Sequence, residues 1–415
     1  MSRLTSPIAW RYALRSLGRH RRRSLLSILG VGLGIAVSLL MIGWVGGEAE
    51  MMKQAAADSG VGNLRIAPAA WPATREDTLR LPEAAQTLAA LRSDPHVAVA
   101  APHARCQALL AMGTRTTGVE ILGVDPAAEP ALNRMVRGVT AGRYLRAGDG
   151  DACVIGAGVA RQLRVEVGDE LLVTASGRGD EMRSAMLHVV GVVRTGSTLI
   201  DDGLCQAPLQ EVENISGYPG PAEITVVLRD PDQLVDFLAA WQPRLPAGAV
   251  AVPWQALIPA LADGVQIDQS FADVIVGVIV LVVFLGIASA QLAAVLERRR
   301  EFAVLVAIGM KGRQLVAAML AEAVLLGLAG AGLGMALGLP LVYRLHAHGF
   351  DFRTVAPDFQ WGVSNILIDP VIHAAMGWWM LPLAVGLALC ATVLGSVYPA
   401  YFALSTDPAN ALRAE

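Results

Sequence analysis

The chain alternates between long apolar runs and sequence of mixed polarity. Four runs, at 25–46, 271–296, 314–342 and 377–402, carry almost no charged side chains. Each is long enough to cross a bilayer as a helix, which takes about 20 residues. We therefore predict four transmembrane helices. The interval between the first two, 47–270, is predicted to be a separate domain with a helical stalk at each end.

Within that interval, short runs of β-branched and aliphatic residues alternate with turn signals such as Gly168-Asp169. Three further stretches, 81–92, 158–163 and 232–241, have helical spacing. This mixture indicates an α+β domain of at most two lobes. The predicted strands are 63–67, 104–112, 117–124, 152–155, 170–174, 186–194, 223–228 and 249–252.

Positive charge orients the spans. Residues 1–24 contain seven arginines and no acidic residue. Trp10, Leu14 and Leu17 recur there at helical spacing, which is typical of an amphipathic helix on a membrane surface. A second basic cluster, Arg298–Arg300, follows the second span. Both clusters lie on the same side if one span, a large domain and another span separate them, and that side is the cytoplasm.

The predicted fold is therefore an α-helical membrane protein with four transmembrane helices plus a large extracytoplasmic α+β domain, and both termini are cytoplasmic. We expect a multi-pass protein of the inner membrane of a bacterium. The predicted order is a cytoplasmic amphipathic helix (1–24), span 1 (25–46), the extracytoplasmic domain with its stalks (47–270), span 2 (271–296), a cytoplasmic coupling helix (297–313), span 3 (314–342), an extracytoplasmic loop (343–376), span 4 (377–402) and a cytoplasmic tail (403–415).

Composition agrees with this class and excludes others. Only 17% of the residues are charged, against about 25% in soluble proteins. The net charge of −3 gives no general attraction to nucleic acid. No Gly-Lys pair occurs, so the chain lacks the P-loop that binds ATP. Neither a metal cluster nor a nucleophile triad is evident, and we expect no enzymatic activity and no cofactor on this chain.

The coupling helix is the main candidate site. Its charged first residues are followed by apolar residues, whose exposure to open water would be unfavourable. One interpretation is ordinary basic flanking of a span. The other is a short helix that docks its apolar face on a partner. The candidate residues are Glu297, Arg298, Arg299, Arg300, Glu301, Phe302, Leu305, Ile308 and Gly309.

Small residues inside the spans indicate close helix packing. Gly30 and Gly34 in span 1, and Gly330, Gly334 and Gly338 in span 3, have the four-residue spacing that lets helix backbones approach. Glu322 lies about two turns into span 3, where a carboxylate is costly. It either contacts another helix or subunit, or reaches toward the interface.

Three cysteines fall in the predicted extracytoplasmic domain, at 106, 153 and 205. Their number is odd and none has CxxC spacing, so isolated buried thiols are favoured over a bridge. Whether any pair of Cys106, Cys153 and Cys205 forms a disulfide is left open by the sequence.

Three segments together resemble the MacB/FtsX-type ABC transporter permeases, also called type VII. Glu297–Met310 resembles their E-R-x-R-E-[IF]-x-x-L-x-A-x-G segment. Ala9–Leu17, followed by Arg21–Arg23, resembles the entry helix and first span. Tyr398–Ala400 with Asp407–Arg413 resembles the Y-P-A…D-P-A-x-A-L-R tail, although Asn410 departs from it. In the middle domain the resemblance is looser, and Gly196–Leu204 leans towards the lipoprotein-releasing branch.

The resemblance implies a mechanism. Two permeases pair, as a homodimer or with a paralogue, and each binds a separate ABC ATPase through the cytoplasmic coupling helix. ATP and Mg belong to that ATPase. The chain would then be a permease subunit that exports or extracts a lipoprotein, a lipid-linked substrate or another amphiphile. Membrane lipids and an adaptor or outer-membrane partner are further expected contacts.

The same resemblance allows a second function. ATPase-driven motion could activate an extracytoplasmic enzyme such as a cell-wall hydrolase, which makes the chain a mechanotransmitting regulator. The size of the extracytoplasmic domain favours the transport function. The substrate and the choice between homodimer and heterodimer are not readable from the sequence.

Overall fold

The computed structural model describes residues 21–405 except 75, 179–180, 298–311, 357–361 and 364–365. The chain divides into two compact units. Unit 1 comprises Met1–Glu48, Gln266–Phe350 and Val371–Glu415, and unit 2 comprises Ala49–Val265 and Asp351–Pro370. Each unit is described by itself.

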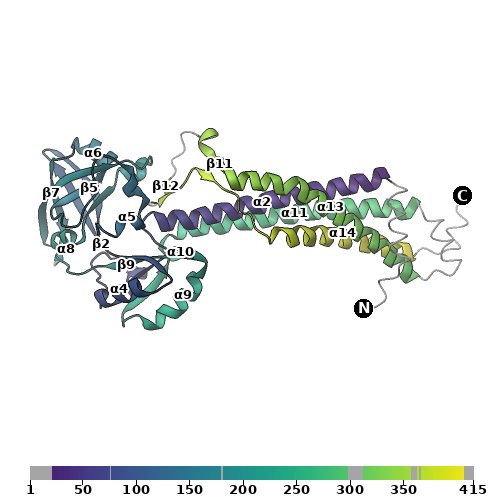
Figure 1. Ribbon diagram of the computed structural model, residues 1–415, viewed down its shortest axis with the longest axis horizontal. Coiled ribbons are helices and arrows are strands. Elements are labelled where there is room, and N and C mark those ends of the chain that lie inside the picture. Colours follow the sequence, from purple (N-terminus) through teal and green to yellow (C-terminus); the bar gives the residue numbers. More distant parts are fainter. Residues whose placement is uncertain are drawn as a thin grey trace, which may run out of the picture. The chain divides into compact units, whose positions relative to one another are not determined.

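Unit 1 is built from four long helices that run side by side (Figure 1). They are α2 (Arg21–Asp58), α11 (Pro259–Glu297), α13 (Gly312–His348) and α14 (Met380–Ser405). All four are long and apolar enough to cross a membrane. The predicted class, four membrane helices with a large α+β domain, is confirmed.

The helices are longer than the predicted spans. With 38 residues, α2 extends ~57 Å, whereas the hydrocarbon core of a bilayer is ~30 Å thick. The last residues of α2, Ala49–Asp58, and the first of α11, Pro259–Val265, belong to unit 2. Both helices therefore continue past the membrane as stalks. Likewise, α13 runs on to His348, into the region predicted as a loop.

Glycines on α13 bring α2 close. A Cβ on Gly334 would lie 2.7 Å from the Ile35 Cβ, and one on Gly338 would lie 3.0 Å from the Ala36 backbone. Gly330 meets Val31 in the same way. Lipid gives helices no hydrophobic reason to associate, so this close van der Waals fit holds α2 against α13.

Gly34 and Gly30 differ, although both belong to one predicted motif. A Cβ on Gly34 would lie 2.7 Å from Val283 of α11. The Cβ position of Gly30 has no other described atom within 4 Å. Gly30 therefore does not pack closely against a neighbouring helix among the described residues.

Unit 2 contains one ten-stranded sheet with the order β10-β1-β9-β2-β3-β8-β5-β7-β4, and β6 pairs with β2 and β7. The long strand β2 pairs with β9 through its first half and with β3 through its second half. It thus runs through two lobes. The strands are β1 (Leu64–Pro68), β2 (Val97–Met112), β3 (Arg115–Val124), β4 (Val139–Gly142), β5 (Ala152–Gly156), β6 (Glu170–Ser176), β7 (Met182–Val193), β8 (Leu204–Pro208), β9 (Glu223–Leu228) and β10 (Ala249–Pro253).

Each lobe has its own apolar core. One core joins β1, β9 and β10 to α4 (Ala84–Ser93) and α9 (Leu234–Trp241). The other joins β2, β3, β5, β6, β7 and β8 to α6 (Ala157–Leu163) and α8 (Leu209–Ser216). Every predicted strand overlaps an observed one. The first half of β2 was missed because Pro102 and its alanine neighbours have low strand propensity.

The close approach of Gly334 to Ile35 predicts that a larger side chain destabilises the protein at Gly334 but not at Gly332. Gly334→Leu should destabilise the full-length chain by about 1–3 kcal/mol, because the new side chain overlaps Ile35. Gly332→Leu on the same helix is the matched control, since no described atom beyond its own turns of helix lies within 4 Å of its Cβ position. Thermal unfolding in detergent measures both. Equal destabilisation by the two substitutions would contradict this packing.

Candidate functional site

Most of the predicted coupling helix lies outside the described residues. Arg298, Arg299, Arg300, Glu301, Phe302, Leu305, Ile308 and Gly309 all fall there. The candidate that the structure describes is Glu297, the exposed last residue of α11. Docking on an ATPase therefore stays a prediction from the sequence.

Glu322 is buried on α13 and has a partner on another helix. Its Oε1 lies 3.6 Å from Nη2 of Arg23, in the first turn of α2. The side chain of Glu322 is 8% exposed, and a carboxylate so placed needs a cation close by. Of the alternatives for Glu322, the structure thus favours a contact between helices, which fixes the start of α2 on α13.

At its other end, α2 stops on a short, partly buried segment of unit 2. Gly60 follows the helix with φ +80, a left-handed conformation that favours glycine. Its N–H donates to Leu132 O over 3.2 Å, and Ser59 forms a bridge with Asn133. We call the segment Glu129–Gly138, which comprises α5 and the 3-10 helix η1, the joint.

The chain between α13 and α14 is bound at the same place. The Leu367 N–H donates to Ser59 Oγ over 3.0 Å. The Leu367 carbonyl accepts a hydrogen bond from Arg134 of the joint, and Arg134 also lies 4.0 Å from Asp369. Ile366 and Ile368 are buried in a core of unit 2. Two segments that leave the predicted spans therefore meet at one joint.

From the joint, buried polar contacts lead into the sheet. Glu129 accepts from Asn133 Nδ2 over 3.0 Å, and its Oε2 lies 2.8 Å from His103 Nε2 on β2. The other ring nitrogen of His103 lies 2.9 Å from Thr225 Oγ1 on β9. Burial raises the pKa of Glu129, but His103 and the Asn133 amide outweigh it, so this pKa is lower than usual.

A row of alternating charges crosses four neighbouring strands. Arg65 of β1 donates to Glu223 of β9 over 3.2 Å. Glu223 also accepts from Arg105 of β2 over 3.1 Å. Arg105 in turn donates to Glu120 of β3 over 2.6 Å. We call these four residues the charge row. Because β2 runs through both lobes, the charge row ties them together.

Because the side chains of the charge row are buried or partly buried, each charge needs the opposite charges beside it. Glu223 is almost fully buried; burial raises its pKa, but Arg65 and Arg105 outweigh that and lower it to about 2. Burial lowers the pKa of Arg65 to about 10. The Nε of Arg65 is buried and has no hydrogen-bond partner among the described residues. Each charge thus depends on its neighbours, because removing one leaves another uncompensated.

A cavity of about 390 Å³ lies between the charge row and the joint. Arg65, Arg105 and Glu120 line it from the sheet, and Asn133 lines it from the joint. Ser59, after the α2 stalk, and Pro259, which begins the α11 stalk, border it too. Both stalk ends therefore border one cavity in unit 2.

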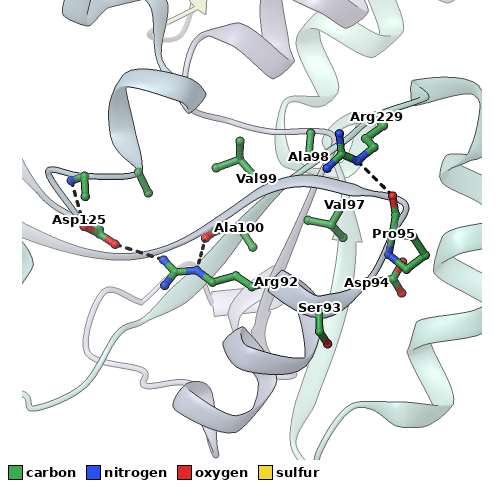
Figure 2. Close-up of a pocket in the computed structure, with 12 residues that line it drawn as sticks. Arg92, Ser93, Asp94, Pro95, Val97, Ala98, Val99, Ala100, Asp125 and Arg229 are labelled. Carbon is green, nitrogen blue, oxygen red and sulfur yellow. Dashed lines mark hydrogen bonds and ion pairs between the residues drawn. The ribbon is translucent and has the colours of Figure 1, made fainter.

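A larger surface pocket, of about 590 Å³, lies along the first half of β2. Figure 2 shows two arginines at its rim. Arg92 donates to Ala100 O and to Asp125, and Arg229 donates to Pro95 O, so both guanidinium groups hold the local backbone. The Ser93 hydroxyl, which also lines the pocket, donates to the Ala90 carbonyl, and we assign the pocket no role.

Other chemistry is sparse in the described part of the chain. No group of three or more His, Cys, Asp or Glu side chains there is placed to hold a metal ion. Cys106, Cys153 and Cys205 are buried free thiols.

The joint and the charge row were missed by sequence reasoning. The available signal was a charged residue in an otherwise apolar strand, as in Arg65 of Leu64–Pro68 and Glu223 of Glu223–Leu228.

Two family models cover most of the chain. A model of the MacB-like periplasmic core domain matches residues 24–243. A model of the FtsX-like permease C-terminal region matches residues 274–408. The first covers more than half of the chain, including the joint and the charge row. The second covers α13, α14 and the predicted coupling helix.

Several curated proteins are similar over their whole length. The lipoprotein-releasing system transmembrane protein LolC of Xylella fastidiosa is 22% identical, covering 99% of this chain and all of that protein. LolC of Neisseria meningitidis is 24% identical over 94% of each chain. The uncharacterized ABC transporter permease YvrN of Bacillus subtilis is 24% identical over 98% of this chain and 99% of its own.

The contacts of the charge row predict that unit 2 loses stability when Glu223 loses its negative charge. Glu223→Gln should cost about 3–5 kcal/mol, because Arg65 and Arg105 lose their buried carboxylate. Glu120→Gln is the control and should cost about 1 kcal/mol, since its side chain is 32% exposed. Hydrogen exchange of the β1 and β9 amides in the full-length chain measures both.

Low pH should have the same effect as Glu223→Gln, because both remove the negative charge of Glu223. The folded pKa of Glu223, about 2, is below its ordinary value of 4.5. Its stabilisation is therefore present above pH 4.5 and is lost as the pH falls toward 2. Protection of β9 should fall in that range in the wild type and less in Glu223→Gln. Identical acid profiles for the two proteins would refute the role given to this carboxylate.

Proposed function

The chain belongs to the ABC transporter permeases that join a MacB-like periplasmic core domain to an FtsX-like permease region, and from this premise we propose that it carries motion from a separate ATPase to a domain outside the membrane. The observation that carries the proposal is the joint. The end of α2 and the segment between α13 and α14 are both hydrogen-bonded to it.

The geometry suits a mechanical connection. An α-helix is stiff along its axis, and α2 and α11 are each much longer than a bilayer requires. Movement of α2 would reach the joint through Ser59 and Gly60. From there His103 and Glu129 lead into β2 and β9. The charge row would carry the movement into both lobes.

The energy source would be on another chain. The segment after α11 would receive an ABC ATPase in the cytoplasm, and ATP and Mg would bind to that subunit. Two permeases, identical or paralogous, would pair in the inner membrane of a bacterium. The two basic clusters support an orientation in which both termini are cytoplasmic and unit 2 lies outside.

The proposed substrate is a lipoprotein or another lipid-linked amphiphile, extracted on the outer side. Full-length similarity to two proteins named for lipoprotein release supports this choice. The substrate need not pass through the membrane, because unit 2 would act on it where its lipid is anchored.

Reconstitution tests this function. The permease and its co-purified ATPase are placed in proteoliposomes that carry a fluorescent diacylated lipopeptide in the outward-facing leaflet. Transfer of the lipopeptide to a soluble acceptor should require ATP. ATP hydrolysis without transfer of any lipid-linked substrate would contradict it, and ATP-dependent activation of an added cell-wall hydrolase would then favour the regulatory function.

A charge reversal tests docking. Arg298→Glu with Arg299→Glu should abolish most co-purification of the ATPase, because the predicted docking helix would carry the opposite charge. Arg21→Glu with Arg22→Glu is the control, since it removes the same charge elsewhere on the predicted cytoplasmic side. Both proteins must insert normally. If the first variant binds the ATPase as well as the wild type does, the docking prediction is wrong.

A change in the joint tests transmission separately. Arg134→Gln removes the contacts with Leu367 and Asp369. We expect ATPase binding to be retained and transfer per ATP hydrolysed to fall severalfold. Arg137→Gln is the neighbouring control on an exposed residue and should leave that ratio unchanged. If Arg134→Gln keeps the wild-type ratio, the joint does not transmit the movement.

A further inference from the structure

Aromatic side chains on three of the four membrane helices occur away from the middle of the span. Trp44 is the only Phe, Tyr or Trp residue of α2, and Tyr343 is the only one of α13. The first such residue of α14 is Tyr398, far along the helix. Trp378 and Trp379 directly precede α14. The apolar middle of each of these helices therefore contains no aromatic ring.

The contacts of Gly43 on α2 show that several of these rings share one level of unit 1. A Cβ on Gly43 would lie 3.2 Å from Val342 of α13 and 3.1 Å from Met380, the first residue of α14. An aromatic residue directly adjoins each of these three positions. Together the rings form one layer across the bundle, which we call the collar: Trp44, Tyr343, Trp378 and Trp379.

A second level lies about one bilayer thickness from the collar. Arg23 of α2 and Glu322 of α13 are paired at 3.6 Å, and on either helix the rise from the ion pair to the ring of the collar is ~32 Å. From the start of α14 to Tyr398 the rise is ~27 Å. The hydrocarbon core of a bilayer is ~30 Å thick. The collar and the ion pair therefore mark the two boundaries of the hydrocarbon core.

Most of the collar is open to its surroundings. The side chain of Trp378 is 87% exposed, and Tyr343 and Trp379 are exposed as well. Such rings suit a layer that is apolar on one side and wet on the other, because each joins an apolar body to one polar N–H or O–H group. The neighbouring residues follow the same gradient, since exposed His373 precedes the two tryptophans and exposed Leu381 follows them.

We propose that the collar binds the layer between headgroups and acyl chains in one leaflet of the bilayer, the leaflet on the side where α2 continues as a stalk. The partner is phospholipid, contacted by the exposed rings of Tyr343, Trp378 and Trp379. A protein partner would have to match both the apolar and the polar side of this layer, whereas a bilayer presents both at the collar's depth. The collar fits either orientation of the chain, so this binding is independent of the proposed function.

Anchoring the collar also fixes the depth of α2. The Ala375 N–H, just before the two tryptophans, donates to the Gly43 carbonyl over 2.7 Å. A Cβ on Gly46 would lie 3.2 Å from the Ala375 Cβ. The turn that the tryptophans hold in the bilayer is thus attached to α2 where its stalk begins. From Trp44 to the end of the helix at Asp58, that stalk rises ~21 Å.

Nitroxide spin labels on the full-length chain in phospholipid vesicles test the depth. Cys390 is exposed on α14, ~17 Å along the chain from Trp379, and its label should collide often with oxygen and rarely with a water-soluble nickel chelate. In a Cys390→Ser background, a label on Trp378→Cys should meet the chelate several times more often than that. It should meet the chelate several times less often than a label on Val235→Cys, an exposed residue of unit 2.

The same labels distinguish lipid from water and from protein. Collisions with the chelate at Trp378→Cys as frequent as at Val235→Cys would place the collar in water and overturn the proposal. Few collisions with either oxygen or the chelate would overturn it too, because a second copy or another protein would then cover the rings.

Tryptophan emission gives an independent measurement. Lipids brominated near the glycerol ester should quench the wild type more than lipids brominated near the chain ends. Trp378→Phe with Trp379→Phe should remove most of that difference. Trp241→Phe is the matched control, since this tryptophan is buried in unit 2, and its loss should leave the difference unchanged. Equal quenching of the wild type and the double variant would contradict binding of lipid by the collar.

Discussion

The structure depends on how the first membrane helix ends. The α2 helix is far longer than a bilayer requires, and its last residues belong to unit 2, where the chain that follows the helix needs hydrogen-bond partners. The joint and the segment between α13 and α14 supply them. The Gly60 N–H donates to the Leu132 carbonyl of the joint, and the Ser59 hydroxyl accepts from the Leu367 N–H. A buried polar group left without a partner costs about 1–3 kcal/mol, so the joint and the stalk end hold each other in place.

The rest of unit 2 extends this contact. Glu129, the first residue of the joint, is fully buried, and its carboxylate lies 2.8 Å from His103 Nε2. The charge row then connects β1, β9, β2 and β3, which belong to two different cores. Charges held in this way have few alternative arrangements, because each displacement leaves another charge unpaired in a poorly hydrated place. The two lobes are therefore expected to respond together to movement of the stalk.

Periodicity and composition were enough to predict the membrane spans and most strands, because those elements follow from local patterns of apolar residues. The short strands β4 and β8 were missed, since β8 has no β-branched or aromatic residue and β4 has only four residues, one of them glycine. The joint could not be predicted, because Ser59, Asn133 and Leu367 are far apart in sequence and meet only through the fold.

The predicted sites divide in the same way. Spacing could not distinguish Gly34, which lies against Val283, from Gly30, whose Cβ position is open, because the neighbours of a helix face are set by the tertiary fold. Glu322 stood out as a costly intramembrane carboxylate, but its partner Arg23 was hidden among other arginines. The family resemblance identified the coupling segment, whose docking the described residues leave as a prediction.

The central claim is that ATPase action reaches unit 2 through the joint. Hydrogen exchange of the permease–ATPase complex, with and without a non-hydrolysable ATP analogue, tests it most directly. The account predicts that nucleotide changes the protection of the Gly60 amide, which is hydrogen-bonded to the joint, and of the Leu367 amide, which is hydrogen-bonded to Ser59 beside it. Altered exchange throughout the membrane helices with no change at Gly60 or Leu367 would contradict it.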